Sequence, residues 1–137
     1  MVVGVALVYG ANAQDRQQDR QPIDPRVSNI NSSGFWEAAG GRGFYRAVTY
    51  RNCSPEHCYY SVVIEWLNER PLRVVARKQI SEVGDLTVVT DVRFVLSNAG
   101  TKLQIRNEKD GVGKWVQCLS LGEPGLYTAQ GRECEAG

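Results

Sequence analysis

Histidine, excess charge and long apolar runs are all scarce in this sequence. His57 is the single histidine among 137 residues, so a catalytic triad or dyad would depend on that one side chain. The 16 Lys and Arg residues nearly balance the 15 Asp and Glu residues. A chain without excess positive charge is not expected to bind nucleic acid or an anionic membrane by bulk electrostatics. No apolar run approaches the roughly 20 residues that a transmembrane helix needs, so we expect no integral membrane span.

The first residues have the pattern of an export signal. An apolar run from Val2 to Tyr9 is followed by Ala11-Asn12-Ala13, a small-x-small site of the kind that signal peptidase cleaves. This pattern predicts a signal peptide over residues 1–13. The basic segment that normally precedes such a run is missing, so either the start codon is misplaced or the signal peptide is truncated. The alternative is that the run forms an N-terminal β-strand.

A polar segment separates this region from the rest of the chain. Residues 14–33 contain two prolines and alternate Asp with Arg. Such a composition cannot bury enough apolar surface to offset the entropy of ordering, so it predicts a flexible linker. The remaining residues, 34–137, suit a single domain with its own core better than two.

Four cysteines in a chain with an export signal predict disulfides. Two local pairings are favoured: Cys53–Cys58 around a short loop, and Cys118–Cys134 near the C-terminus. A structural zinc site would need paired short spacings such as C-x-x-C, which these cysteines do not have. We therefore expect disulfides and no metal, in a periplasmic or secreted protein.

From Gly34 onward, short runs rich in aromatic and β-branched residues alternate with turn residues. Among the turns, Lys109-Asp110-Gly111 is a strong hairpin signal. The central hairpin covers residues 44–67, where two such runs flank the loop between Cys53 and Cys58. The sequence predicts an all-β fold: an antiparallel β-sandwich or small barrel of seven to eight strands, largely a meander. The expected strands are residues 34–39, 44–52, 59–67, 72–80, 86–96, 101–107, 113–121 and 126–130.

Alternation along these strands assigns their two faces. The predicted core comprises Tyr60, Val62, Ile64, Trp66, Val74, Ala76, Ile80, Leu86, Val88, Val92, Phe94, Leu96, Leu103 and Ile105. The opposite face mixes valines with charges of both signs: Val63, Glu65, Arg73, Val75, Arg77, Val89, Asp91, Arg93 and Val95. Cross-strand ion pairs between valines of good β-propensity would explain this face without any partner. The alternative is a flat face that docks another protein.

The sequence contains little that indicates an enzyme active site. His57 would need an activated nucleophile nearby, but the two loop cysteines are better used as a disulfide and Ser54 has no nucleophile motif around it. Most carboxylates stand at turns, where acidic residues are common anyway. The glycine-rich segments at 40–43 and 111–114 lack the full phosphate-loop pattern. We expect no enzymatic activity and no cofactor.

Three groups of residues are candidates for binding. A constrained loop is suited to recognition, because part of its ordering cost is met before a partner binds. Its candidate residues are Pro55, Glu56 and His57. The arginines of the charged-valine face form the second group: Arg73, Arg77 and Arg93.

Aromatic residues form the third group, because exposed rings can stack on sugars. Trp36 follows the predicted linker directly, and either it is exposed with Phe35 or it closes one end of the sandwich. The sequence thus predicts a non-catalytic exported β-domain that binds another extracytoplasmic protein, as an inhibitor, an immunity-type antagonist or an assembly factor. The alternative is a carbohydrate- or peptidoglycan-binding module.

Overall fold

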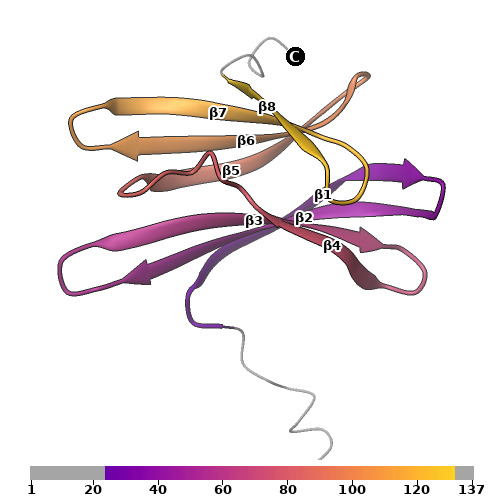
Figure 1. Cartoon of the computed structure of the whole chain (residues 1–137), viewed down its shortest axis with the longest axis horizontal. Coiled ribbons are helices and arrows are strands. Elements are labelled where there is room, and N and C mark those ends of the chain that lie inside the picture. The colour runs from indigo at the N-terminus through magenta and orange to yellow at the C-terminus, as the bar shows by residue number, and fades with distance from the viewer. Residues whose placement is uncertain (1–23, 132–137) are drawn as a thin grey trace, which may run out of the picture.

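Two four-stranded antiparallel sheets make up the computed structural model, which describes residues 24–131 (Figure 1). The first sheet, sheet A, contains β1 (Val27–Ala38), β2 (Gly41–Cys53), β3 (Cys58–Asn68) and β4 (Arg73–Gln79). Sheet B contains β5 (Val88–Ser97), β6 (Gly100–Lys109), β7 (Gly113–Leu121) and β8 (Tyr127–Gly131). Within each sheet every strand pairs with its neighbours in sequence, so each sheet is a meander. The predicted all-β antiparallel sandwich is confirmed, and in residues 24–131 the two sheets do not join into a barrel.

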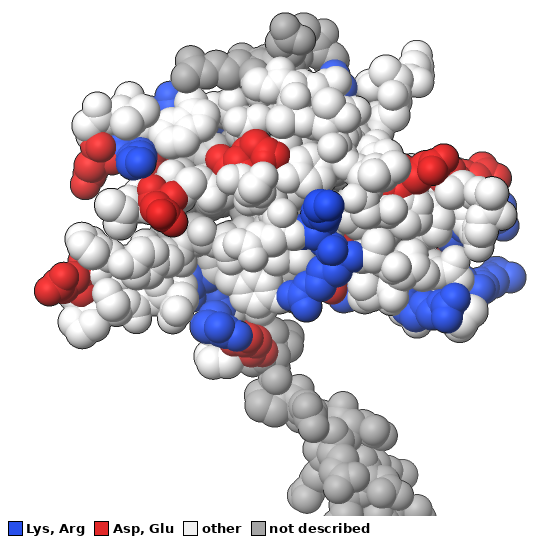
Figure 2. All heavy atoms as spheres, in the orientation of Figure 1, with Lys and Arg blue, Asp and Glu red and all other residues white. Residues whose placement is uncertain are grey.

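The four edge strands are not equally covered. The edges of β1 and β5 lie close together, and the side-chain amide of Asn31 on β1 donates to the carbonyl of Val92 on β5. On the other side of the sandwich, β4 pairs only with β3. Lys and Arg side chains gather over β4 in the view of Figure 2. Sheet A therefore has one covered edge and one open, basic edge.

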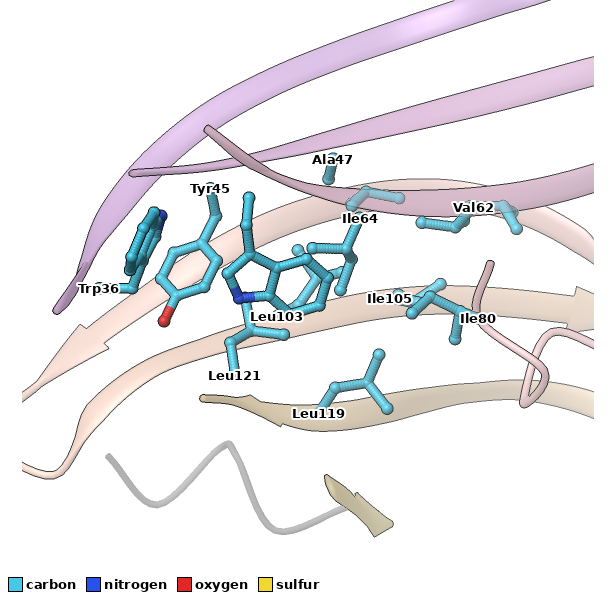
Figure 3. Packing of buried hydrophobic residues seen from close by; sticks show 13 residues of the cluster. Trp36, Tyr45, Ala47, Val62, Ile64, Ile80, Leu103, Ile105, Leu119 and Leu121 are labelled. Carbon is cyan, nitrogen blue, oxygen red and sulfur yellow. The ribbon is translucent and has the colours of Figure 1, made fainter. Parts of the chain in front are cut away.

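The core fills the space between the sheets (Figure 3). Trp66 and Ile64 of β3 are fully buried, as are Leu103 and Ile105 of β6. Burying an aliphatic side chain of this size contributes about 1.5–3 kcal/mol. The cluster consists of Trp36, Tyr45, Ala47, Val62, Ile64, Trp66, Ile80, Val89, Val92, Leu103, Ile105, Leu119 and Leu121.

One carbonyl satisfies the polar atoms of two core aromatics. Tyr45 and Trp66 both come from sheet A, with ring centroids 6.1 Å apart in an edge-to-face arrangement. The Tyr45 hydroxyl and the Trp66 indole N–H each donate to the carbonyl of Gly122, at 3.0 Å, in the β7–β8 connection. Because a buried donor without a partner is costly, this carbonyl helps to fix sheet B against sheet A.

The core assignment from alternation was correct for β3 and β6 but wrong for several edge positions. Val74, Leu86, Val88 and Leu96 were predicted to be buried and are exposed. They lie on β4, on β5 or just before β5, and both strands are sheet edges with neighbours on one side only. Alternation identifies a face, but it does not show how far the opposing sheet extends.

A β-bulge in β5 explains the error at Val89. Val89 pairs with Asn107 and Asp91 with Arg106, so Thr90 is an extra residue in the ladder. The bulge shifts the alternation by one residue and turns Val89 and Val92 toward the core together. Val89 was predicted to lie on the opposite, charged face, and that prediction was wrong.

The first strand starts earlier than the sequence indicated. β1 begins at Val27, inside the segment predicted as a linker, and its polar residues pair with β2 at the edge of sheet A. Gly34 interrupts this strand with a φ of 76°, and a Cβ there would lie 2.7 Å from side-chain atoms of Thr101. Residues 14–23 of the predicted linker, and the signal peptide predicted over residues 1–13, lie outside the described residues.

The first predicted disulfide is confirmed. Cys53 and Cys58 face each other in the register of β2 and β3, and their sulfur atoms are bonded. In the second predicted pair, Cys118 is buried in β7. Its predicted partner, Cys134, lies outside the described residues.

Candidate functional site

The loop between β2 and β3 is closed by hydrogen bonds as well as by the Cys53–Cys58 bridge. The Ser54 hydroxyl accepts from the backbone N–H of His57 at 3.1 Å, and the Ser54 N–H donates to the His57 carbonyl at 2.7 Å. The side chains of Pro55, Glu56 and His57 are all exposed. This loop, residues 53–58, is therefore an exposed tip with a restrained backbone, and we call it the stapled loop.

A cleft of about 390 Å³ opens beside the stapled loop. Its walls come from the stapled loop, from the start of β5 and from the turn between β6 and β7. These segments lie at the same end of the sandwich, where the hairpins of the two sheets diverge (Figure 1). The lining residues of this stapled-loop cleft are Glu56, His57, Cys58, Tyr60, Leu86, Val88, Lys109 and Asp110.

The stapled-loop cleft combines apolar and charged walls. Tyr60, Leu86 and Val88 supply apolar surface, and Tyr60 packs against the core on its other side. Glu56, Lys109 and Asp110 supply charges of both signs. An apolar pocket with a polar rim is the arrangement that protein–protein interfaces use to hold an anchor side chain. The cleft can therefore accept an apolar group and orient it with the rim.

Leu86 is unusual in both its backbone and its exposure. Its φ is 59°, and it is the only non-glycine residue with a positive φ among residues 24–131. The left-handed conformation costs an L-amino acid about 1–2 kcal/mol. Its side chain is nevertheless half exposed, with 51% of the residue accessible. Neither backbone preference nor burial explains a leucine here, and such outliers concentrate at functional sites.

The structure holds Leu86 in place through its neighbours. Thr87 and Val89 are buried on the C-terminal side, and Ile80 is buried where β4 leads into the connection. The Val83 N–H donates to the Ile80 carbonyl at 3.4 Å within this connection. The connection is thus anchored in the core at Ile80 and Val83, and β5 is anchored at Val89. Leu86 lies between these anchors and lines the cleft.

Only two of the predicted binding residues come together in this cleft. Glu56 and His57 line it, and Pro55 is exposed at the tip of the same loop. The predicted charged-valine face is not one surface, because Arg73 and Arg77 lie on β4 of sheet A whereas Arg93 lies on β5 of sheet B.

The arginines also differ in their partners. Arg93 is bound to Asp91, with 2.6 Å between its guanidinium and the carboxylate. Arg77 donates to the Tyr50 hydroxyl at 2.8 Å and lies 4.0 Å from the Glu65 carboxylate. Arg73 makes no ion pair within residues 24–131. Arg73 is thus the one predicted arginine that is free to meet a ligand.

Trp36 closes one end of the sandwich, which is the second of the two predicted alternatives. Its accessibility is 5%, and its indole N–H donates to the carbonyls of Phe44 and Leu67, at 3.1 and 3.2 Å. A buried ring cannot stack on a sugar. Trp36 is therefore a core residue, and the prediction that it forms a glycan-binding surface was wrong.

The sequence analysis did not identify the wall of the cleft that lies opposite the stapled loop. Leu86 and Val88 were assigned to the core, and Lys109 and Asp110 were taken only as a hairpin turn. The Lys109-Asp110-Gly111 signal gave the turn correctly, but which turn faces the stapled loop depends on the packing of two sheets. No residue pattern marks the positive φ of Leu86.

Among residues 24–131 no group of three or more His, Cys, Asp or Glu side chains is arranged to hold a metal ion. The same residues contain no helix that is long and apolar enough to cross a membrane. The side chain of His57 makes no hydrogen bond within this range.

Comparisons with known proteins leave the site to be interpreted from its own geometry. No protein-family model matches the chain, no curated protein matches it, and no solved structure matches it.

Proposed function

We propose that this chain is a non-catalytic exported domain that binds another extracytoplasmic protein. The stapled-loop cleft receives an apolar side chain of the partner, which packs against Tyr60, Leu86 and Val88. The charged rim then selects the residues on either side of that anchor. The observation that carries the proposal is Leu86, a half-exposed leucine held at positive φ in the wall of the cleft.

The restrained backbone of the stapled loop supports this function. A loop that is already ordered loses little conformational freedom when a partner binds, so more of the contact energy appears as affinity. The disulfide and the Ser54 hydrogen bonds fix the position of Glu56 and His57 relative to the strands. A cleft with fixed walls can discriminate between partners by shape.

Glycan binding has weaker support. Exposed aromatic rings would have to share one surface to form a stacking platform. Phe35 lies near the β1–β2 turn, whereas Tyr59 lies beside the stapled loop at the opposite end of sheet A. With Trp36 buried, the described residues offer no such platform formed by these rings.

Capture from the envelope fraction of the producing organism tests the proposal. A photo-reactive residue placed at Asp110, on the rim, should crosslink to one protein, and the same residue at Asn98, in the β5–β6 hairpin, should not. Leu86→Gly should abolish the crosslink, because glycine tolerates the positive φ while it removes the anchor surface. Leu126→Gly, at an exposed leucine outside the cleft, is the matched control.

Two results would overturn the proposal. A crosslink that persists at full yield in the Leu86→Gly protein would show that the cleft does not hold the partner. Equal crosslinking from positions 110 and 98 would show that the captured protein binds the domain non-specifically and not at the cleft.

A further inference from the structure

The outer edge of β4 is a row of backbone groups without strand partners. β4 pairs with β3 along one side, and no other strand of residues 24–131 pairs with it. By contrast, the β1 edge of the same sheet faces β5. An edge strand of this kind can add an extended segment of another chain through main-chain hydrogen bonds.

The charge of this edge has one sign. The segment from Arg70 to Lys78 contains four cations and no acid: Arg70, Arg73, Arg77 and Lys78. The net charge of the whole chain is only +1, so the remaining residues are together net negative. Figure 2 shows several groups of Lys and Arg side chains on the part of the surface where β4 lies in Figure 1. The positive charge is therefore a local property of the β4 edge.

Most of these cations are available to a ligand. Arg77 is occupied by Glu65 and Tyr50. Within the described residues, Arg70, Arg73 and Lys78 make no ion pair and no side-chain hydrogen bond. Two exposed positive charges thus stand on β4 and a third in the turn before it, all without a counter-charge among the described residues.

A bulge in β4 places two of the free cations on the same face. Arg73 pairs with Asn68 and Lys78 with Ile64, and these two β3 residues lie on one side of the sheet. Without a bulge, residues five apart would point to opposite faces. Val75 is an extra residue in the ladder and shifts the alternation of side chains by one position, so Arg73 and Lys78 project from the same face.

Exposed apolar residues lie between the cations. Leu72, Val74 and Val75 are all exposed on or next to β4. An incoming strand could therefore combine main-chain pairing, apolar contact and ion pairs along a single edge. This combination is typical of strand addition, in which alternate side chains provide specificity.

We propose that the β4 edge binds an extended acidic segment of another polypeptide as a fifth strand of sheet A. Acidic residues at alternate positions of that segment meet Arg73 and Lys78. A second copy of this chain does not fit, because pairing β4 with β4 would bring like charges together. A nucleic acid would meet the cations but could not pair in register with both the N–H and C=O groups of the strand. This site does not depend on the stapled-loop cleft.

The experiment uses the full chain and synthetic peptides of the same length as β4. In the first peptide glutamate alternates with valine, and in the second lysine replaces every glutamate. The third keeps the glutamates but has proline at the valine positions, which retains the charge and removes the N–H groups that strand pairing needs. Binding is followed by amide chemical shifts in NMR and by hydrogen exchange of the β4 amides.

We expect the glutamate–valine peptide to shift and protect the amides of β4, and the other two peptides to leave them unchanged. Arg73→Glu/Lys78→Glu should weaken this binding by about tenfold or more and create binding of the lysine peptide. Arg106→Glu/Lys114→Glu makes the same change in net charge on exposed residues of sheet B and should have no effect. Unfolding curves of both double variants confirm that they are folded.

Three outcomes would contradict the proposal. Equal binding of the proline peptide would mean that charge alone attracts the ligand. Displacement of the glutamate–valine peptide by single-stranded DNA, when the phosphate groups are as concentrated as the peptide's carboxylates, would show that the edge binds polyanions in general. The third outcome is that the glutamate–valine peptide shows no saturable binding and that Arg73→Glu/Lys78→Glu aggregates both with and without the lysine peptide. This outcome would mean that the cations only protect the edge from self-association.

Discussion

Arg46 and Glu65 form an ion pair across β2 and β3, with 2.8 Å between Nε and Oε1. The Glu65 side chain is only 10% exposed although it lies on the outer face of sheet A. Arg77 approaches the other carboxylate oxygen from β4, at 4.0 Å. One glutamate thus connects three adjacent strands, and its neighbours shield it from water.

Replacement of Glu65 by Gln should destabilise the protein by about 1 kcal/mol, because Arg46 loses a charge-assisted acceptor while part of its guanidinium remains in water. Glu108→Gln, at an exposed glutamate of β6, should change the free energy of unfolding by less than about 0.5 kcal/mol. Urea unfolding of both variants measures the difference. Equal stability of the Glu65 variant and the wild type would show that the ion pair contributes nothing.

Among the glycines of sheet A, Gly43 leaves the least space for a side chain. A Cβ at this residue would lie 1.7 Å from the backbone carbonyl oxygen of Leu67 on β3, so β2 and β3 would have to move apart. Gly43→Ala should therefore cost about 3 kcal/mol or prevent folding. At Gly40 a Cβ would meet nothing within 4 Å. Gly40→Ala should be near neutral, and similar unfolding midpoints for the two variants would contradict this account.

Local patterns were enough to predict strands β2 to β8 and the centre of the core, although not the start of β1. Val62, Ile64 and Trp66 alternate in β3, which has a paired strand on both sides, and all three are fully buried. The Lys109-Asp110-Gly111 turn was likewise recognised from its residues alone. Where a strand is central and regular, its two-residue period determines which side chains face the other sheet.

Bulges and sheet packing account for what the sequence did not show. Thr90 is an ordinary β-residue, yet its insertion in the ladder turns Val89 toward the core. Trp36 follows a polar segment, yet the carbonyls of Phe44 and Leu67 accept from its indole inside the fold. Both outcomes depend on residues distant in sequence. The candidate site depends on them as well, because its walls come from both sheets.

Removal of the Cys53–Cys58 bridge should destabilise the chain moderately. The bridge closes a loop of four residues, and the entropy model gives about 2 kcal/mol for so short a loop. Cys53→Ser/Cys58→Ser should lower the urea midpoint by a corresponding amount and speed hydrogen exchange at the His57 amide. Unchanged exchange at His57 would mean that the Ser54 hydrogen bonds alone hold the stapled loop.

The Asp24–Arg26 pair should give a measurable acid titration. Hydrogen bonds from the Arg26 guanidinium, and then from its backbone N–H, lower the pKa of the Asp24 carboxyl from 3.8 to about 2. Because the folded-state pKa is depressed, the pair stabilises the fold above pH 3.8 and loses that effect as the pH falls toward 2. NMR titration of Asp24 measures the pKa directly. Arg26→Gln should raise this pKa only part of the way toward 3.8, because the backbone N–H of residue 26 still donates to the Asp24 carboxylate. An unchanged pKa would exclude the Arg26 guanidinium as the cause.

Leu86→Gly should leave stability almost unchanged, although it removes a large side chain. Glycine relieves the cost of a φ of 59°, which is about 1–2 kcal/mol for an L-residue. Glycine also gives the unfolded chain more conformational freedom, which destabilises the fold by about 0.5–1 kcal/mol. The lost side chain was half exposed, so its removal sacrifices little buried surface. These effects nearly cancel. Leu126→Gly, at an exposed leucine without positive φ, lacks the first effect and should lose about 1 kcal/mol. If Leu86→Gly proved the more destabilising of the two in urea unfolding, Leu86 would be a packing residue and not a strained leucine presented to the cleft.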